Sequence, residues 1–373
     1  MKRVAILSLY YKNYNYGGQL QSYALQKTIQ NLGYQCEQIS FNRERKDVFW
    51  RKIRQIMRST VVEKKKYILR VYNSFMRRFK KIPMDNATFD RFDQWMYDIP
   101  HTSIVNRDTI SSIKDDYDFF VVGSDQVWNP EFVPMTFFLD FIDNNNKKIA
   151  YAASTRIKKF EKKESKIIKN LLSEFNYISV RENDAKKLLR DIGVSKDIDV
   201  NLDPTLLLSK EEWTKKIIKP EIKQQFIFTY LISDPFALNQ IREFAIQNQC
   251  KIISVNTPGY ITDEDDVFIR LKSGVGPAEF LGLIANARYV FIESFHGIVF
   301  SLIFEKDFFV YGELSDDRKI TLLNLVGLSD KLINHSASYN EFVFKEINYN
   351  IVKQKIEDEK NKSIQRLRHY LGE

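Results

Sequence analysis

The sequence predicts an α/β protein made of two Rossmann-like domains facing each other. The chain has 373 residues, more than one hydrophobic core usually fills. Short β-rich runs alternate with helical patterns along most of it, as in parallel sheets covered by helices on both faces. A charged stretch, residues 209–225, interrupts this alternation once. We therefore expect an N-terminal domain over residues 1–209, a C-terminal domain over 210–346 and a terminal helix over 347–373.

The first block opens with an apolar run, Val4–Tyr10, which predicts a strand. Leu20–Leu32 carries apolar residues at helical spacing, and Gly33 is placed to end that helix. The same reasoning applies to the rest of the block. The further expected strands are Gln35–Phe41, Asp118–Val122, Lys147–Ala153, Tyr177–Arg181 and Ile198–Leu202, and the further helices are Ser165–Phe175 and Asp184–Asp191.

The alternation restarts after Gln225 and predicts a second parallel sheet. A long charged helix, Ile347–Leu371, ends the pattern. The expected strands of this block are Phe226–Ile232, Lys251–Val255, Arg288–Ile292 and Phe308–Tyr311, and its helices include Pro277–Ala285 and Gly297–Phe304.

The positive charge of the chain is concentrated in one insert of the N-terminal domain, residues 43–97. Residues 43–81 hold 15 Lys/Arg and three Asp/Glu, a net of +12, whereas the rest of the chain has a net of −3. The insert has a helical pattern in which aromatic residues alternate with arginines. It predicts either an amphipathic surface for an anionic membrane or a helical hairpin with a solvated basic face. Nucleic-acid binding ranks third, because no recognised nucleic-acid motif accompanies the charge.

Composition excludes several other classes. The two cysteines, Cys36 and Cys250, rule out a disulfide framework. They lie in strand-like runs and predict buried free thiols, with a single structural bridge as the alternative. The four histidines are not grouped with carboxylates at metal-ligand spacing, so we expect no metal site. No apolar stretch is long enough to span a bilayer, and the first apolar run is too short for a signal peptide. We expect a cytoplasmic protein, with or without contact to a membrane surface.

Ligands of open parallel sheets bind at the carboxyl ends of the strands, and this rule selects the candidate residues. After the first strand, Gly17 and Gly18 allow close approach of a ligand or form a plain tight turn. After the Asp118–Val122 strand, several polar side chains and an aromatic ring suit a sugar, or else cap a turn. These residues are Ser124, Asp125, Gln126, Trp128 and Asn129.

Two further strand ends carry groups suited to anions. Arg181 follows the Tyr177 strand and predicts either a clamp for a carboxylate or phosphate, or an ordinary salt bridge. His296 lies between the Arg288 strand and the next helix, where an imidazole can reach a cleft and the helix N-terminus favours an anion. The alternative for His296 is a capping or core position.

These pieces together resemble the polysaccharide pyruvyl transferase family. The matching stretches occur in the family's order between about residues 4 and 328, and the two most specific are residues 123–130 (GSDQVWNP) and 294–297 (SFHG). The other matching stretches are residues 15–25 (NYGGQLQSYAL), 151–154 (YAAS), 178–182 (ISVRE) and 202–207 (LDPTLL).

The resemblance implies a fold like that of two-domain, GT-B-type glycosyltransferases. It also implies transfer of a pyruvyl group from phosphoenolpyruvate to sugar hydroxyls of a surface-polysaccharide precursor, giving a cyclic ketal, with phosphoenolpyruvate as co-substrate and no cofactor. By analogy, His296 is the general acid, Arg181 an anion clamp and Asp125 the base or the residue that orients the sugar. The implied donor-binding residues are Arg181, Ser294, His296, Gly297, Arg318 and Arg156, and the implied acceptor-binding residues are Gly17, Gly18, Gln21, Ser124, Asp125, Gln126, Trp128 and Asn129.

The sequence departs from the family pattern at two places. Some members have an arginine where this chain has Ser294, and many have Phe-Gly where this chain has Thr155-Arg156. Arg156 is therefore a candidate for the missing cation. A membrane-facing basic insert would suit a sugar acceptor carried on a lipid at the cytoplasmic leaflet. The alternatives are a GT-B glycosyltransferase that uses a nucleotide sugar and a non-catalytic sugar-binding component of polysaccharide assembly.

Overall fold

The computed structural model describes most of the chain and divides it into two compact units. The described residues are 1–43, 85–130, 133–232, 234–255, 266–269, 271, 274–312, 316–334, 336–338, 340, 342 and 345–372. Unit 1 comprises the described residues of Met1–Lys52, Met96–Ser209 and Gln354–Glu373, and unit 2 those of Ile53–Trp95 and Lys210–Lys353. Residues 44–84 of the predicted basic insert lie outside the described residues.

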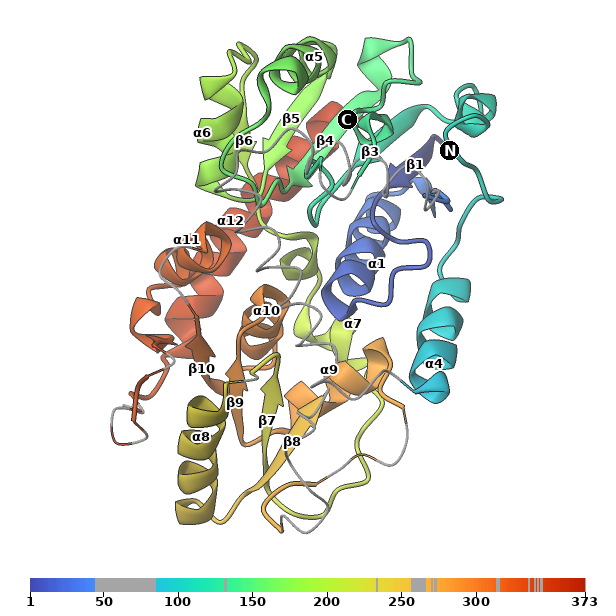
Figure 1. Cartoon of the computed structure of the whole chain (residues 1–373). Coiled ribbons are helices and arrows are strands. Elements are labelled where there is room, and N and C mark those ends of the chain that lie inside the picture. The colour runs from blue at the N-terminus through green and yellow to red at the C-terminus, as the bar shows by residue number, and fades with distance from the viewer. Residues whose placement is uncertain are drawn as a thin grey trace, which may run out of the picture. The chain divides into compact units, whose positions relative to one another are not determined.

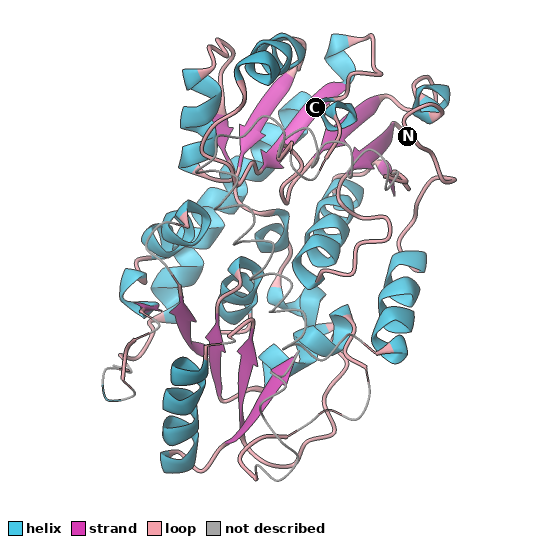
Figure 2. Ribbon diagram, viewed as in Figure 1, coloured by secondary structure: helices cyan, strands magenta, loops and turns pink. Residues whose placement is uncertain are grey.

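Unit 1 is built on a six-stranded sheet in the order β2-β1-β3-β4-β5-β6, in which every pair of neighbours is parallel. Helices flank the sheet (Figures 1 and 2). The strands are β1 (Arg3–Leu7), β2 (Gln35–Gln38), β3 (Phe119–Val122), β4 (Lys148–Ala153), β5 (Tyr177–Val180) and β6 (Asp199–Val200). The helices are α1 (Tyr16–Asn31), α5 (Lys162–Ser173) and α6 (Asn183–Asp191), with shorter turns η1 (Ile110–Ile113), η2 (Met135–Phe138), η3 (Asn145–Lys147) and η4 (Pro204–Leu207).

Unit 2 is built on a five-stranded parallel sheet in the order β11-β10-β9-β7-β8. Its strands are β7 (Phe226–Tyr230), β8 (Lys251–Val255), β9 (Tyr289–Ile292), β10 (Asp307–Tyr311) and β11 (Leu332–Ile333). Its helices are α7 (Lys210–Thr214), α8 (Pro235–Gln247), α9 (Pro277–Asn286), α10 (Phe295–Ile303) and α11 (Asp317–Val326), and the turn η5 is Ser329–Lys331. The predicted α/β class with two parallel sheets is thereby confirmed.

The central strands are buried on both faces, as the apolar runs predict. All six residues of β4 are buried, including Lys148, whose ammonium lies 2.5 Å from a carboxylate oxygen of Glu174. A buried lysine needs such a partner, because an isolated charge in the core is costly. Each unit has a hydrophobic core of its own between sheet and helices.

Two helices differ from the predicted domain division. Helix α4 (Asn86–Tyr97) ends the predicted insert, yet its residues up to Trp95 belong to unit 2, where Thr88 Oγ1 accepts a hydrogen bond from Val275 N at 3.1 Å. Helix α12 (Tyr349–Tyr370) is not a separate terminal element, because from Gln354 onward it belongs to unit 1. There Ser363 Oγ accepts from Leu202 N at 3.2 Å.

One further expectation concerns membrane spans. Within the described ranges, no helix combines the length and the mean hydropathy that crossing a membrane would require.

Candidate functional site

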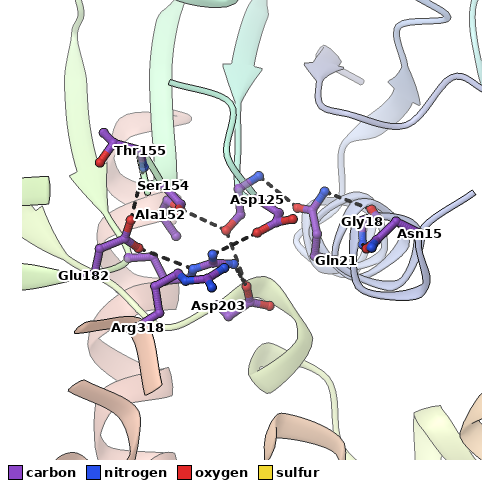
Figure 3. A network of polar contacts seen from close by, with 12 residues as sticks. Asn15, Gly18, Gln21, Asp125, Ala152, Ser154, Thr155, Glu182, Asp203 and Arg318 are labelled. Carbon is purple, nitrogen blue, oxygen red and sulfur yellow. Dashed lines mark hydrogen bonds and ion pairs between the residues drawn. The ribbon is translucent and has the colours of Figure 1, made fainter. Parts of the chain in front are cut away.

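In unit 1, four loops at the carboxyl ends of parallel strands bring polar residues together. The loop after β3 supplies Ser124 and Asp125, the loop after β4 supplies Ser154, and the loop after β5 supplies Arg181 and Glu182. Asp203 follows β6. Because neighbouring parallel strands end at the same edge of a sheet, residues far apart in sequence meet there. Figure 3 shows the carboxylates of Asp125, Glu182 and Asp203 directed toward a common centre.

That centre is the guanidinium of Arg181. Its Nη1 donates to Asp203 Oδ2 at 2.7 Å, and its Nη2 donates to Asp125 Oδ1 at 2.9 Å. Its Nε lies 3.5 Å from Glu182 Oε2. Burial by itself would lower the pKa of Arg181, but the charges of Asp125, Asp203 and Glu182 outweigh it, and the pKa is raised above its ordinary value. Arg181 is therefore a permanent cation inside the unit.

The two inner carboxylates are held by further donors. Asp203 Oδ1 accepts from Thr205 N at 3.0 Å and from Thr205 Oγ1 at 2.6 Å. Glu182 Oε1 accepts from Ser154 Oγ at 2.7 Å and from Thr155 N at 3.1 Å. Hydrogen bonds of this kind to a carboxylate fix its orientation as well as its charge.

The three carboxylates differ in exposure. The side chains of Asp203 and Glu182 are 0% and 3% exposed, whereas that of Asp125 is 12% exposed. The Arg181 side chain is 2% exposed. Among the members of this cluster, Asp125 thus has the side chain most accessible to solvent.

The predicted acceptor residues on α1 and after β3 are tied to each other. Gln21 Oε1 accepts from Ser124 N at 2.8 Å, and Gln21 Nε2 donates to Gly18 O at 3.0 Å. Asn15 caps α1 by accepting from Gly18 N at 2.9 Å, which starts the helix at Tyr16, four residues before the predicted start. A Cβ at Gly18 would collide with the Asn13 side chain, and Gly17 is buried beside it. These residues position the loops of the site.

Trp128 corrects one of the sequence-based predictions. Its ring is fully buried, stacked on Phe138 with ring centroids 5.5 Å apart and edge-on to Phe175 at 6.0 Å. The indole Nε1 donates to Phe137 O at 3.2 Å. The prediction that this ring offers a face to a sugar is wrong in this structure. Burying so large an aromatic ring in the core removes more apolar surface from water, and so stabilises the fold more, than leaving it at the surface. Asn129 is buried as well.

Two other predicted residues of unit 1 lie on loops with left-handed backbone. Gln126 is half-buried with φ 52°, and Arg156 is exposed with φ 51°. Such conformations are uncommon outside glycine and hold a loop in one particular path. They place Gln126 in the loop after β3 and Arg156 in the loop after β4.

In unit 2, the loop between β9 and α10 carries the predicted histidine. Ser294 is the N-cap of α10 and accepts from Gly297 N at 3.4 Å. His296 lies in the first turn, 6% exposed, with its ring edge-on to Phe295 at 5.2 Å between centroids. A Cβ at Gly297 would press on the side chain of Ile292 at 3.0 Å, so this turn packs tightly on β9.

The segment after β10 in unit 2 carries two cationic side chains, Arg318 and Lys319. Arg318 donates from Nε and Nη2 to the two carboxylate oxygens of Asp316, at 2.9 and 2.8 Å. The neighbouring Lys319 is 6% exposed; its Nζ lies 3.4 Å from Tyr311 O and 4.0 Å from Asp316 Oδ2. Asp316 thus pairs with Arg318 and lies near Lys319, and Asp317 adds a second carboxylate in the first turn of α11.

Comparison with known proteins decides the family. The family model described as "Polysaccharide pyruvyl transferase" matches residues 15–315, which include the whole Arg181 cluster and the first turn of α10. The chain belongs to the polysaccharide pyruvyl transferase family. A comparison with curated individual proteins finds no match.

Solved structures of other enzymes share the fold. A putative UDP-N-acetylglucosamine 2-epimerase from Listeria monocytogenes is similar with a TM-score of 0.53 and 10% identity, over 98% of this chain and 90% of the epimerase. A UDP-GlcNAc 2-epimerase from Neisseria meningitidis, solved with UDP-GlcNAc, has a TM-score of 0.50 and 8% identity, over 100% and 99% of the two chains. These likenesses show the GT-B-like fold of this polysaccharide pyruvyl transferase family member.

Sequence reasoning found some members of the site and missed others. Glu182 and Asp203 lay in family stretches but were not assigned to the site, although the strand-end rule points to both. Lys319 was missed as well, and the same rule applied to β10 would have selected the segment from Asp316 onward. Within the described residues, no three His, Cys, Asp or Glu side chains are grouped to hold a metal ion.

Proposed function

We propose that the protein transfers the pyruvyl group of phosphoenolpyruvate to two hydroxyls of a sugar in a polysaccharide precursor. In this reaction the methylene carbon of the donor gains a proton and becomes a methyl group. The central carbon forms two C–O bonds to the sugar and loses its bond to the phosphate oxygen. Of the two hydroxyl protons released, one balances the methyl group and the other leaves with inorganic phosphate. The family match over residues 15–315 carries this proposal.

Asp125 is the proposed acceptor-side catalytic residue. Its carboxylate is the partly exposed member of the Arg181 cluster and is held by Arg181 Nη2 at 2.9 Å. A carboxylate fixed in this way can accept the proton of a sugar hydroxyl as that oxygen attacks. Arg181 then acts as a positioning residue, because its guanidinium is directed to carboxylates of its own unit. In this proposal Arg181 does not bind the donor anion directly, as the family resemblance implied, but orients Asp125.

The donor-side residues proposed for phosphoenolpyruvate lie in unit 2. The first turn of α10, with Ser294 and Gly297, offers backbone N–H groups and a favourable helix dipole to an anion. His296 is the proposed acid for the methylene carbon. Arg318 and Lys319 supply positive charge that suits the carboxylate and phosphate of the donor.

We also propose that the reaction takes place in the cytoplasm, on an acceptor carried by a lipid at the inner leaflet. The basic composition of residues 43–81 supports this, because such segments are attracted to anionic headgroups.

A second candidate function is glycosyl transfer or epimerisation with a nucleotide sugar. The observation that favours it is the shared fold with the Neisseria meningitidis epimerase, which was solved with UDP-GlcNAc. The two candidates require different donors, so donor binding separates them.

The deciding experiment measures thermal melting with millimolar phosphoenolpyruvate and, separately, with UDP- and GDP-sugars. A ligand at 100 times its Kd stabilises the folded state by about 2.7 kcal/mol, a shift of several degrees at this size. We expect a shift with phosphoenolpyruvate that is lost in His296→Asn and kept in the control His369→Asn, an exposed histidine of α12. Release of inorganic phosphate on adding candidate sugars then tests turnover. A shift with a nucleotide sugar alone would contradict pyruvyl transfer.

A further inference from the structure

The exposed face of α5 and the loop before it form a lysine-rich surface that the site does not use. Residues 158–169 contain six lysines and two glutamates. All six lysines are exposed, as is Ile167, with 50% of its surface accessible. The opposite face of α5 packs into the core through Ile168 and Leu172. We name this surface the α5 lysine face; its lysines are Lys158, Lys159, Lys162, Lys163, Lys166 and Lys169.

These lysines differ from those surface lysines of the protein that pair with a nearby acid. Lys114 pairs with Asp143 at 2.7 Å and Lys187 with Asp191 at 2.6 Å, as is common on protein surfaces. Within the described part of the chain, the side chains of the α5 lysine face make no ion pair or hydrogen bond. Lys162 and Lys166 are also one helical turn apart, an arrangement of like charges that destabilises a helix. The surface therefore concentrates positive charge at a cost to its own helix.

The shape of this surface indicates its partner. The lysines spread over a helix face and the preceding loop, without converging on one point as the ligands of a small anion would. An exposed isoleucine lies among them. Basic side chains around an apolar one suit the headgroup region of an anionic bilayer, where lysines meet lipid phosphates and the apolar side chain enters the acyl boundary. A water-soluble polyanion would gain nothing from Ile167.

The α5 lysine face is connected to the site of unit 1 by the loop after β4. The loop after β4 carries Ser154 and Thr155, which hold Glu182, and it leads through Lys158 and Lys159 into α5. Helix α5 and strand β4 both belong to unit 1, and both are labelled in Figure 1. We propose that the α5 lysine face docks unit 1 on a membrane rich in anionic phospholipid. This inference is separate from the reaction proposed above, because vesicle binding requires no substrate.

The test uses the full chain in co-sedimentation with vesicles of phosphatidylcholine containing about one third phosphatidylglycerol, at low salt. The test variant replaces Lys162, Lys163, Lys166 and Lys169 with Gln. A lysine near an anionic leaflet contributes roughly fivefold in affinity, so we expect at least tenfold weaker binding. Wild-type binding should also weaken as salt is raised. If the fourfold variant does not fold, K162Q/K166Q serves instead, with a smaller loss expected.

Two control variants separate this surface from net charge. The same four lysines changed to Arg keep the charge and should bind as wild type does. Four exposed lysines of unit 2 changed to Gln remove equal charge elsewhere and should also leave binding unchanged. These control positions are Lys215, Lys219, Lys223 and Lys345. Ile167→Ser should weaken vesicle binding by a smaller factor than the lysine variant.

Several results would overturn the proposal. Wild-type affinity in the fourfold Gln variant would assign any membrane binding to another part of the chain. An equal loss of vesicle affinity in the fourfold Gln variant and in the unit 2 control would show that only the net charge of the protein matters. No vesicle binding by the wild type, with or without binding to a soluble acidic polysaccharide, would exclude the membrane as the partner.

Discussion

Arg181 donates a hydrogen bond from Nη2 to Asp125 Oδ1 at 2.9 Å and thereby joins the loop after β5 to the loop after β3. The arginine is buried, whereas the aspartate is the partly exposed member of the cluster. One residue thus supplies a fixed charge and the other presents a carboxylate to solvent. The consequences of removing either one are different.

Asp125→Asn should reduce activity far more than stability. The amide cannot accept a proton from a hydroxyl, and loss of a general base typically costs about 10²-fold or more in kcat. Arg181 keeps Asp203 at 2.7 Å and Glu182 at 3.5 Å, so the melting temperature should fall by only a few degrees. Phosphate release and thermal melting measure the two effects. Asp143→Asn, an exposed acid of the same unit, is the control and should change neither.

Arg181→Met should destabilise unit 1 by about 3–5 kcal/mol, because it leaves buried carboxylates without their cation. The difference in the free energy of unfolding between wild type and variant should become smaller as the pH falls from 8 to 5. Protonation of the buried carboxylates then removes the negative charges that have lost their cation. Melting curves of wild type and variant across that range test both statements. Arg190→Met removes an arginine whose side chain is 39% exposed and pairs with the exposed Asp197 at 3.9 Å, so it should destabilise the protein much less. A deficit that does not change with pH would contradict the electrostatic explanation.

Trp128→Ala should lower the free energy of unfolding by about 3–5 kcal/mol through loss of core packing against Phe138 and Phe175. The KM for a sugar acceptor should stay unchanged in Trp128→Phe, measured at a temperature where the variant is folded. A large rise in this KM with unchanged stability would instead indicate that Trp128 contacts the sugar acceptor.

Lys331 provides a pH-dependent prediction for unit 2. It is 1% exposed, and burial lowers its pKa below the ordinary value. In the window between the lowered folded pKa and the ordinary value near 10.5, the unfolded state binds more protons, so the contribution of Lys331 to stability rises with pH. The melting temperature of wild type relative to that of Lys331→Met should therefore rise from pH 7 to pH 10. A difference independent of pH would contradict this assignment.

Strands and helices were predictable because their signals are local. The apolar runs that predict β1 and β9 are buried on both faces in parallel sheets, and the match between periodicity and structure is close there. Helix α1 began earlier than predicted because a hydrogen bond from Gly18 N to the Asn15 side chain extends it. Such a cap depends on one side-chain geometry that apolar spacing does not report.

The candidate site was predictable only in part. The strand-end rule located Asp125 and Arg181, but not that three carboxylates share one guanidinium, since that depends on the order of strands across the sheet. It also could not separate a tryptophan at the surface from one in the core. Trp128 follows polar residues in sequence, whereas the structure turns its ring toward Phe138.

The division of helix α12 also has a consequence for biosynthesis. Its residues from Gln354 belong to unit 1, where Tyr370 stacks on Tyr177 with ring centroids 4.2 Å apart and Leu371 O accepts from Tyr34 Oη at 2.9 Å. These residues are translated after all of Lys210–Lys353. Unit 1 is therefore completed only after the residues of unit 2 have been synthesised, although its first strands are made earlier. A premature stop between Lys353 and Gln354 would remove residues from unit 1 and leave Lys210–Lys353 of unit 2 intact.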